Sequence, residues 1–308
     1  IKMSRQHVVT FYSIENIKDH KKIGRSVERF CLRNNLVGTF FSTPQGINTT
    51  LSGKKFSLLD LINLLEEKFK LKIKDQTWSE SKSNPFKRLK IKCRDKLLPL
   101  DGNFDPVENR GKHVDHIEWN QLIRNPETVI IDVRNDYETE LGSFPNALIP
   151  DMKNLTEFPD FIENNLSGDK KKNIAMFCTG GIRCEIASSF MLEKGYESVH
   201  QLDGGILRYL KDADEENLWE GECFVFDERV AVDKNLQEGK YVQCFGCRRP
   251  LSERDLESEF YEKGVSCHKC YHLSSKKDKE RFAQRQLQID LAEERGEIHM
   301  GLNAKQSK

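Results

Sequence analysis

The residues best suited to chemistry form one short loop, Cys178-Thr179-Gly180-Gly181-Ile182-Arg183. An apolar run over 173–177 precedes this loop, and apolar residues at helical spacing follow it up to residue 194. The pattern predicts that a strand leads into a helix at Cys178, which in α/β folds is the sheet edge where ligands bind. Loop amides and a helix N-terminus favour negative charge, so we expect a lowered thiol pKa and an anion or polarised oxygen beside the sulfur. Arg183 adds a positive charge that does not titrate near neutral pH.

The spacing from Cys178 to Arg183 is C-x4-R, and the next residue is Cys184. Cysteine phosphatases use a roomier C-x5-R loop that wraps a tetrahedral phosphate. A C-x4-R loop resembles instead the active loop of the rhodaneses, which are sulfurtransferases, and suits a sulfur atom or another small group on the cysteine. The alternative is a structural cysteine before a Gly-Gly turn. For Cys184 we favour packing at the start of the helix over resolution of an oxidised Cys178.

Four further cysteines have the spacing of metal ligands. They form the pattern C-x2-C-x19-C-x2-C, and their positions are Cys244, Cys247, Cys267 and Cys270. This spacing is typical of structural zinc sites, in which four thiolates close a tetrahedral coordination sphere. His268 and His272 are alternatives to one of the thiol ligands. A zinc ion would also stabilise a segment that is too short to build a large core of its own.

Composition limits the classes of protein that are possible. The chain has 308 residues, and its 49 lysines and arginines balance 49 aspartates and glutamates, so no overall charge demands a nucleic-acid partner. It contains no apolar run of about 18 residues, which predicts no membrane span and no membrane partner. In a secretion signal an apolar segment follows the charged first residues. No such segment follows the charges of residues 1–5. Nine cysteines, four of them in C-x-x-C pairs, suit a reducing compartment, and we predict a cytoplasmic location.

Three domains of mixed α/β and α+β type are predicted around these sites. Residues 1–95 show strand and helix patterns in the order βαββαβ, which matches a ferredoxin-like domain. Residues 96–112 contain two prolines and two glycines and form a linker. Residues 113–215 alternate strands and helices, which predicts a rhodanese-like α/β domain with a parallel sheet covered on both faces. Residues 216–275 form a small zinc-binding module, and residues 276–308 form an exposed charged helix and tail.

The last strand predicted in the amino-terminal domain, over residues 89–93, alternates apolar and basic residues. Seven basic residues and one acidic residue lie between 82 and 96, and the basic ones on this strand include Arg88, Lys90 and Lys92. Phe86 and Trp78 lie nearby in the sequence and have rings that can stack on bases. The sequence allows two interpretations, a surface that binds an RNA backbone or an ordinary solvated face of a sheet.

Segments outside the loop extend the resemblance to rhodaneses. Asp132-Val133-Arg134, followed by Glu138 or Glu140, resembles the D-x-R…E segment of that family, and residues 202–206 resemble its closing L-x-G-G segment. Asp132 and Arg134 are expected at the same sheet edge as Cys178, where charge-assisted hydrogen bonds would fix the loop. For these two residues we favour a structural role over direct catalysis.

The octamer over residues 178–185, with the βαββαβ domain before it and the segment over 221–229 after it, resembles one bacterial family more closely. That family is the oxygen-dependent tRNA uridine(34) hydroxylases, and the resemblance covers essentially residues 7–270. It implies 5-hydroxylation of the wobble uridine, with tRNA as partner and molecular oxygen as co-substrate. The sequence itself shows no motif for an organic cofactor. The resemblance also implies that Cys178 is catalytic together with Arg183. The loop residues expected to contact the substrate are Thr179, Gly180, Gly181 and Ile182.

The same loop can use its thiol in more than one way. A persulfide on Cys178 would make the chain a thiosulfate-type sulfurtransferase or a persulfide carrier, which is the alternative function. As a hypothesis for hydroxylation, the thiolate adds to C6 of uridine and makes C5 nucleophilic toward oxygen. The third possibility is a non-catalytic RNA-binding protein. The intact Cys178 argues against that class, and the additional domains argue against a simple sulfurtransferase.

Overall fold

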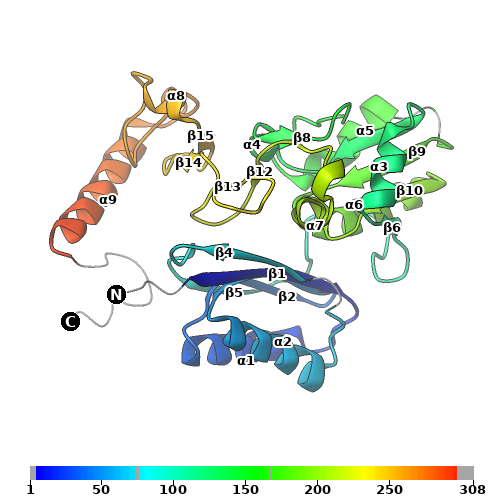
Figure 1. Ribbon diagram of the computed structural model, residues 1–308, viewed down its shortest axis with the longest axis horizontal. Coiled ribbons are helices and arrows are strands. Elements are labelled where there is room, and N and C mark those ends of the chain that lie inside the picture. The colour runs from blue at the N-terminus through cyan, green and yellow to red at the C-terminus, as the bar shows by residue number, and fades with distance from the viewer. Residues whose placement is uncertain (1–4, 74–75, 167, 169, 297–308) are drawn as a thin grey trace.

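The computed structural model describes residues 5–73, 76–166, 168 and 170–296, and it has three regions (Figure 1). A sheet with two helices below it comes first, an α/β region lies above this sheet to the right, and an extended carboxy-terminal region lies above it to the left. The mixed α/β multidomain class predicted from the sequence is confirmed. The predicted tail over 297–308 lies outside the described residues.

A five-stranded sheet and two helices form the amino-terminal region. The elements are β1 (Gln6–Ile14), α1 (His20–Arg33), β2 (Val37–Thr43), β3 (Gly46–Gly53), α2 (Lys55–Phe69), β4 (Gln76–Ser81) and β5 (Leu89–Cys93). The strand order is β4-β1-β3-β2-β5, and both helices lie on one face of the sheet (Figure 1). β1 pairs antiparallel with β3 and β4, whereas β5 pairs parallel with β2.

The two faces of this sheet have different neighbours. Val9, Phe11 and Phe40 are buried against the apolar side chains of α1 and α2. Because side chains alternate along a strand, Tyr12 and Phe41 point to the opposite face, which we call the helix-free face. This face is turned toward the rest of the chain (Figure 1).

The structure corrects the predicted order of strands in this region. The sequence indicates that the strand over 89–93 closes the βαββαβ unit. In the structure β4 closes it by pairing with β1, and β5 is an additional strand at the other edge. β4 has no alternation of apolar and polar residues, and its only large apolar side chain is Trp78. Backbone pairing with β1 holds this edge strand in place, and hydrophobic periodicity does not reveal such pairing.

The second region is the predicted parallel sheet with helices on both faces. Its four strands have the order β6-β10-β9-β7, and all neighbours are parallel. The elements are β6 (Lys112–Val114), α3 (His116–Arg124), β7 (Thr128–Asp132), α4 (Asp136–Thr139), α5 (Phe158–Leu166), β9 (Asn173–Phe177), α6 (Ile182–Glu193), β10 (Ser198–Leu202) and α7 (Gly205–Asp212).

Strand β9 fixes the start of the loop that contains Cys178. Ile174 and Met176 of this strand pack with α5 and α6, whereas Ala175 and Phe177 pack with α3 and α7 on the other face. A strand buried on both faces has a continuous apolar sequence, as this one does. Full burial of one such large apolar side chain contributes about 1.5–3 kcal/mol, so the strand cannot slip without a large loss.

Short strand pairs and one long helix make up most of the rest of the described chain. The remaining strands are β8 (Gly142–Ser143), which pairs with β11 (Glu220–Gly221), β12 (Cys223–Phe224) with β13 (Ala231–Val232), and β14 (Val242–Gln243) with β15 (Pro250–Leu251). The remaining helices are η1 (Leu155–Glu157), η2 (Asp214–Glu216), α8 (Glu253–Leu256) and α9 (Lys276–Glu294). α9 buries only Ala292, which agrees with the exposed helix that the sequence predicts. Within the described residues, every helix is too short or too polar to cross a membrane.

Candidate functional site

Cys178 lies directly after β9, and α6 begins at Ile182, which is the predicted strand-to-helix position. The thiol is fully buried, and the backbone amide of Gly181 donates a hydrogen bond to its Sγ at 3.2 Å. Gly181 has a φ of 92°, a conformation that favours glycine, and this lets the backbone curl around the sulfur. Gly180 and Ile182 are the partly exposed members of the loop, and substrate contact by the loop residues stays a prediction.

The surroundings of Cys178 favour its thiolate form. Burial disfavours the charged form, but the Cys184 thiol, the Arg183 guanidinium and the amides of both residues outweigh it and lower the pKa of Cys178 to about 6. Burial, together with the neighbouring Cys178 sulfur, raises the pKa of Cys184 well above its usual range. At neutral pH Cys178 is therefore mostly thiolate, whereas Cys184 is a protonated thiol buried in the core at the start of α6.

Glu138 forms a buried ion pair with Arg183. Nη1 and Nη2 of Arg183 donate to the two carboxylate oxygens of Glu138 at 2.5 and 2.7 Å, and the hydroxyl of Thr179 donates to the same carboxylate at 3.0 Å. Burial disfavours the Glu138 carboxylate, but the charge and hydrogen bonds of Arg183 lower its pKa. Removal of one partner from a buried pair of this kind costs about 3–5 kcal/mol. The pair ties the Cys178 loop to α4.

Asp132 and Arg134 form a second buried pair behind the loop. Nε and Nη2 of Arg134 donate to the two oxygens of Asp132 at 2.8 and 2.6 Å. Arg134 also donates to the carbonyl oxygens of Glu138 and Gly142, at 3.2 and 2.6 Å. These bonds join the end of β7 to α4 and β8. A structural role for Asp132 and Arg134 stays our prediction.

Strand β1 covers the Cys178 loop with the helix-free face of the amino-terminal sheet. The hydroxyl of Tyr12 donates to Oε1 of Glu185 in the first turn of α6 at 2.7 Å. A Cβ at Gly181 would meet the Tyr12 hydroxyl at 2.9 Å, and a Cβ at Gly180 would lie 3.7 Å from the methyl group of Thr10. Gly181 therefore serves two purposes, because it permits the loop backbone and also the close approach of Tyr12.

Glu185 is the centre of a buried polar network that joins the two regions. His113 lies 2.8 Å from Oε1, and the Arg110 guanidinium lies 3.4 Å from Oε2. Burial disfavours the Glu185 carboxylate, but hydrogen bonds from His113 and Tyr12 and the charges of His113 and Arg110 lower its pKa. The hydrogen bond to Glu185 is also the main cause that raises the pKa of His113. No sequence pattern indicates Tyr12, His113 or Arg110, and the only local signal is the place of Glu185 in the octamer.

Replacement of Tyr12 by Phe is expected to expose Cys178. A hydrogen bond to a charged group contributes about 1.5–3 kcal/mol, so its loss should make labelling of Cys178 by iodoacetamide about tenfold faster or more. Peptide mass spectrometry of the labelled chain measures the rate. Tyr241→Phe is the matched control, because the Tyr241 hydroxyl forms no hydrogen bond within the described residues. Equal labelling of both variants would contradict a closing role for Tyr12.

The thiolate of Cys178 is expected to form well below the pH at which a free thiol ionises. Its pKa of about 6, against an ordinary value of 9.0, predicts a rise in thiolate ultraviolet absorbance as the pH passes upward through 6. The absorbance difference between the wild-type chain and Cys178→Ser isolates this group. Since the pKa is lowered by folding, its stabilising contribution is complete above pH 9 and is lost as the pH falls through 6. A transition near pH 9 in the difference spectrum would contradict the assignment.

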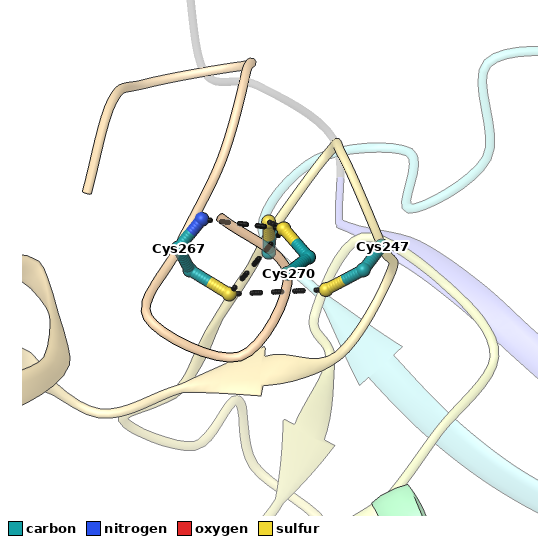
Figure 2. Close-up of side chains that lie close together, drawn as sticks. Cys247, Cys267 and Cys270 are labelled. Carbon is teal, nitrogen blue, oxygen red and sulfur yellow. Dashed lines mark hydrogen bonds between the residues drawn. The ribbon is translucent and has the colours of Figure 1, made fainter. Parts of the chain in front are cut away.

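The four cysteines of the C-x-x-C pairs meet as the spacing predicts. Figure 2 shows Cys247, Cys267 and Cys270 directed toward one another. The Sγ–Sγ distances are 3.8 Å for Cys247–Cys267 and 3.9 Å for Cys267–Cys270, and Cys244 lies 3.9 Å from Cys270. All four sulfurs lie within 4.8 Å of one another. Tetrahedral zinc with Zn–S bonds of about 2.3 Å places its sulfurs about 3.8 Å apart, so the cluster fits structural zinc. In the described part of the chain this cluster consists of cysteines alone, without His268 or His272.

Three ion pairs anchor the cysteine module on α4 and on Glu140, the residue that follows this helix. Arg249 binds the carboxylates of Asp136 and Glu140, and its Nη1 lies 2.7 Å from the Glu140 oxygen. Lys269 also binds Glu140. α4 is the helix that contains Glu138, the partner of Arg183. The metal site and the Cys178 loop are therefore linked through one short helix.

The structure places Arg88, Lys90 and Lys92 away from the Cys178 loop, at and beside the edge strand β5. Lys90 and Lys92 are exposed on the helix-free face, and Lys92 lies opposite Phe41 in the register of β5 and β2. Trp78 is not available for base stacking there, because it is partly buried against the helical core. RNA contact by these basic residues stays a prediction.

Family models match the two regions that contain the large sheets. Residues 116–212 match the model of the Rhodanese-like domain, and the matched segment contains Cys178 and the loop that follows it. Residues 6–97 match the UPF0176 acylphosphatase like domain. With these two domains in this order, the chain has the architecture of the UPF0176 family. This confirms, for the domain architecture, the family resemblance that the sequence predicts, and it supports a rhodanese-type, sulfurtransferase-like enzyme.

Solved rhodanese structures resemble part of the chain. The rhodanese-like domain from Anabaena is 22% identical to the matched part of this chain, with a TM-score of 0.30. The match covers 35% of this chain and 78% of the Anabaena domain. The rhodanese-like domain protein from Staphylococcus aureus is 28% identical, with coverage of 32% and 90% and a TM-score of 0.27. The rhodanese-related protein from Thermoplasma volcanium is 20% identical, with coverage of 33% and 92% and a TM-score of 0.28.

Proposed function

We propose that the chain catalyses oxygen-dependent 5-hydroxylation of the wobble uridine in tRNA, with Cys178 as its nucleophile. One observation supports this function best. The Cys178 thiolate is covered by the helix-free face of the amino-terminal sheet. Farther along the same face, toward strand β5, Lys90 and Lys92 are exposed. A rhodanese that acts on small sulfur compounds has no need of a second sheet that covers its cysteine loop and carries cations farther along the same face. An enzyme whose substrate is a polyanion needs cations that hold this substrate while one part of it reaches the buried thiolate.

The proposed reaction begins with addition of the Cys178 thiolate to C6 of uridine, which moves an electron pair toward C5. C5 then forms a bond to one atom of molecular oxygen. Two electrons and two protons reduce the second oxygen atom to water, and we assign them to an external thiol reductant. Loss of the C5 proton breaks the sulfur–C6 bond and restores the ring. The Gly181 amide faces the sulfur, and the Arg183–Glu138 pair holds the loop during these steps.

The test is nucleoside mass spectrometry of tRNA from cells that lack this protein and any second hydroxylation pathway. Complementation with the wild-type chain should restore 5-oxygenated wobble uridine. Growth under isotopically labelled oxygen gas should place the label at C5, because the oxygen atom comes from O2. If the nucleosides do not change, or if the label enters from water, the proposed function is wrong.

A sulfurtransferase or persulfide carrier is the second candidate, and the rhodanese domain with a thiolate at Cys178 favours it. It predicts a sulfur atom on Cys178 that cyanide releases as thiocyanate after incubation with thiosulfate. Hydroxylation predicts no dependence of product formation on thiosulfate. The two functions therefore give opposite results in one assay with and without a sulfur donor.

A further inference from the structure

Strands β2 and β5 display cations and an aromatic ring on the helix-free face. The ammonium of Lys92 and the guanidinium of Arg94 lie 5.3 and 5.1 Å from the centre of the Phe41 ring. Within the described residues, none of the cations Arg88, Lys90, Lys92 and Arg94 forms an ion pair with a carboxylate. This surface therefore has positive charge that the protein itself leaves uncompensated.

The cysteine module adds a second ring and further cations next to this strand. Phe245, between the zinc-ligand positions Cys244 and Cys247, is 37% exposed. Lys87 and Arg248 lie 5.6 and 5.2 Å from the centre of its ring. The two modules repeat one arrangement, in which an aromatic ring is flanked by two cations.

The two parts are close enough for their charges to interact. The pKa of Lys90 is lowered mainly by burial. The positive charges of Arg88, Lys92 and Arg248 lower it further. Arg248 belongs to the cysteine module and the other three to the amino-terminal region, so like charges from two modules are held together. Such repulsion is a cost in the free chain, and a polyanion removes it on binding.

We propose that these residues form one RNA-binding surface that belongs jointly to the amino-terminal sheet and the cysteine module, with Phe245 as a platform for an unpaired base. We call it the basic-aromatic surface, and it consists of Phe41, Arg88, Lys90, Lys92, Phe245 and Arg248. The inference rests on the proposed function, because that function makes RNA the partner. Rings interleaved with cations suit single-stranded segments and loops, whose bases are free to stack. An RNA duplex keeps its bases stacked internally and would meet only the charges.

The position of the surface relative to Cys178 supports a substrate role. Its strand residues share the helix-free face with Tyr12, whose hydroxyl reaches the first turn after the Cys178 loop. Lys87, which lies beside Phe245, forms an ion pair with Glu228 at 3.1 Å. Two residues before Glu228, the ring of Phe226 is 60% exposed and lies 5.9 Å from the Arg183 guanidinium. A bound RNA loop would therefore have exposed rings and cations from Phe245 to the edge of the catalytic loop.

The experiment measures fluorescence anisotropy of a labelled RNA stem-loop with the full-length, zinc-loaded chain. Phe245→Ala should weaken binding of the stem-loop about fivefold or more and leave a blunt RNA duplex of the same length unaffected. Phe56→Ala is the matched control, because Phe56 is also an exposed ring beside a lysine, with 60% exposure against 37% for Phe245, but it lies on α2 at the helical face. Phe245→Tyr keeps a ring and should keep the affinity. Zinc content verifies that each variant retains the module.

The charges are tested by the dependence of binding on salt. Lys90→Gln combined with Arg248→Asn should reduce the slope of log affinity against log salt by about 1–2, whereas Lys21→Gln with Arg25→Gln on α1 should not change it. Equal losses for Phe245→Ala and Phe56→Ala, equal binding of duplex and stem-loop, or preference for phosphatidylserine vesicles over RNA would each overturn the proposal.

The Cys178→Ser chain separates this inference from the proposed function. It should bind the stem-loop as tightly as the wild-type chain, because Cys178 is outside the basic-aromatic surface. If the wild-type chain binds the stem-loop through Phe245 but forms no hydroxylated uridine, the proposed function fails and the surface stands. If it forms the product while the surface variants bind normally, the surface fails and the function stands.

Discussion

Cys178→Ser is expected to reduce the formation of 5-hydroxyuridine in tRNA to the background, a loss of about a thousandfold or more. The reason is electrostatic. The loop stabilises a thiolate with a pKa of about 6, and a serine hydroxyl in the same place stays protonated and is a poor nucleophile. Nucleoside mass spectrometry of tRNA incubated with the purified chain, oxygen and a thiol reductant measures the product. The fold should persist, because the two side chains differ by one atom.

Two controls make this result specific. Cys93→Ser should leave activity unchanged, because Cys93 is an exposed thiol on β5 that faces α1 and lies outside the loop. In addition, tRNA with 5-fluorouridine at the wobble position should form a covalent adduct with the wild-type chain and none with Cys178→Ser. Full activity of Cys178→Ser would disprove nucleophilic catalysis by this residue. Repeated absence of an adduct with the wild-type chain would argue against addition to C6.

Cys267→Ser is expected to release the metal and unfold the cysteine module. Structural zinc sites contribute about 10–16 kcal/mol of binding free energy, and folding of a small module depends on it. The module also anchors α4 through Arg249 and Lys269, so the Arg183–Glu138 pair should loosen and activity should fall. Metal analysis should find one zinc per wild-type chain and a clear deficit in the variant. Limited proteolysis should cut the variant between residues 240 and 275.

His268→Ala is the matched control for the metal site. His268 lies next to a ligand cysteine in the sequence, but its ring faces Asp255 at 3.7 Å and is outside the cluster of sulfurs. The variant should keep its zinc and its resistance to protease. Loss of zinc from His268→Ala, together with retention by Cys267→Ser, would mean that the ligand set is wrong.

The parts of the site that sequence predicts are those with local causes. Cys178 follows a run of apolar residues buried on both faces, and the glycines and Arg183 come within the next five positions, so one short window contains the loop. The four cysteines likewise form two tight pairs, and their spacing alone indicates a common ion. Each of these predictions depends on residues that constrain one another along the chain.

Tertiary contacts explain what the sequence did not reveal. Tyr12 and Glu185 are 173 positions apart, and nothing around Tyr12 distinguishes it from other strand residues. The anchor of Arg249 on α4 similarly spans 113 positions. β4 was not predicted because its polar sequence has no strand pattern. Its pairing with β1 makes it a strand. In each case the deciding contact comes from another region of the fold.

The burial of Cys178 beneath Tyr12 has a consequence for the lifetime of the protein. Oxidants attack thiolates, and the rate depends on how accessible the sulfur is. A thiolate that is formed at neutral pH but covered by β1 is in a protected resting form, safe from irreversible conversion to sulfinic acid. In the proposed reaction the cover must open to admit a base, so the apparent affinity for substrate would be lowered in proportion to the fraction of molecules that are open. The covered form thus lowers the affinity for substrate but slows oxidation of Cys178 in the presence of the oxygen that the chain is proposed to use.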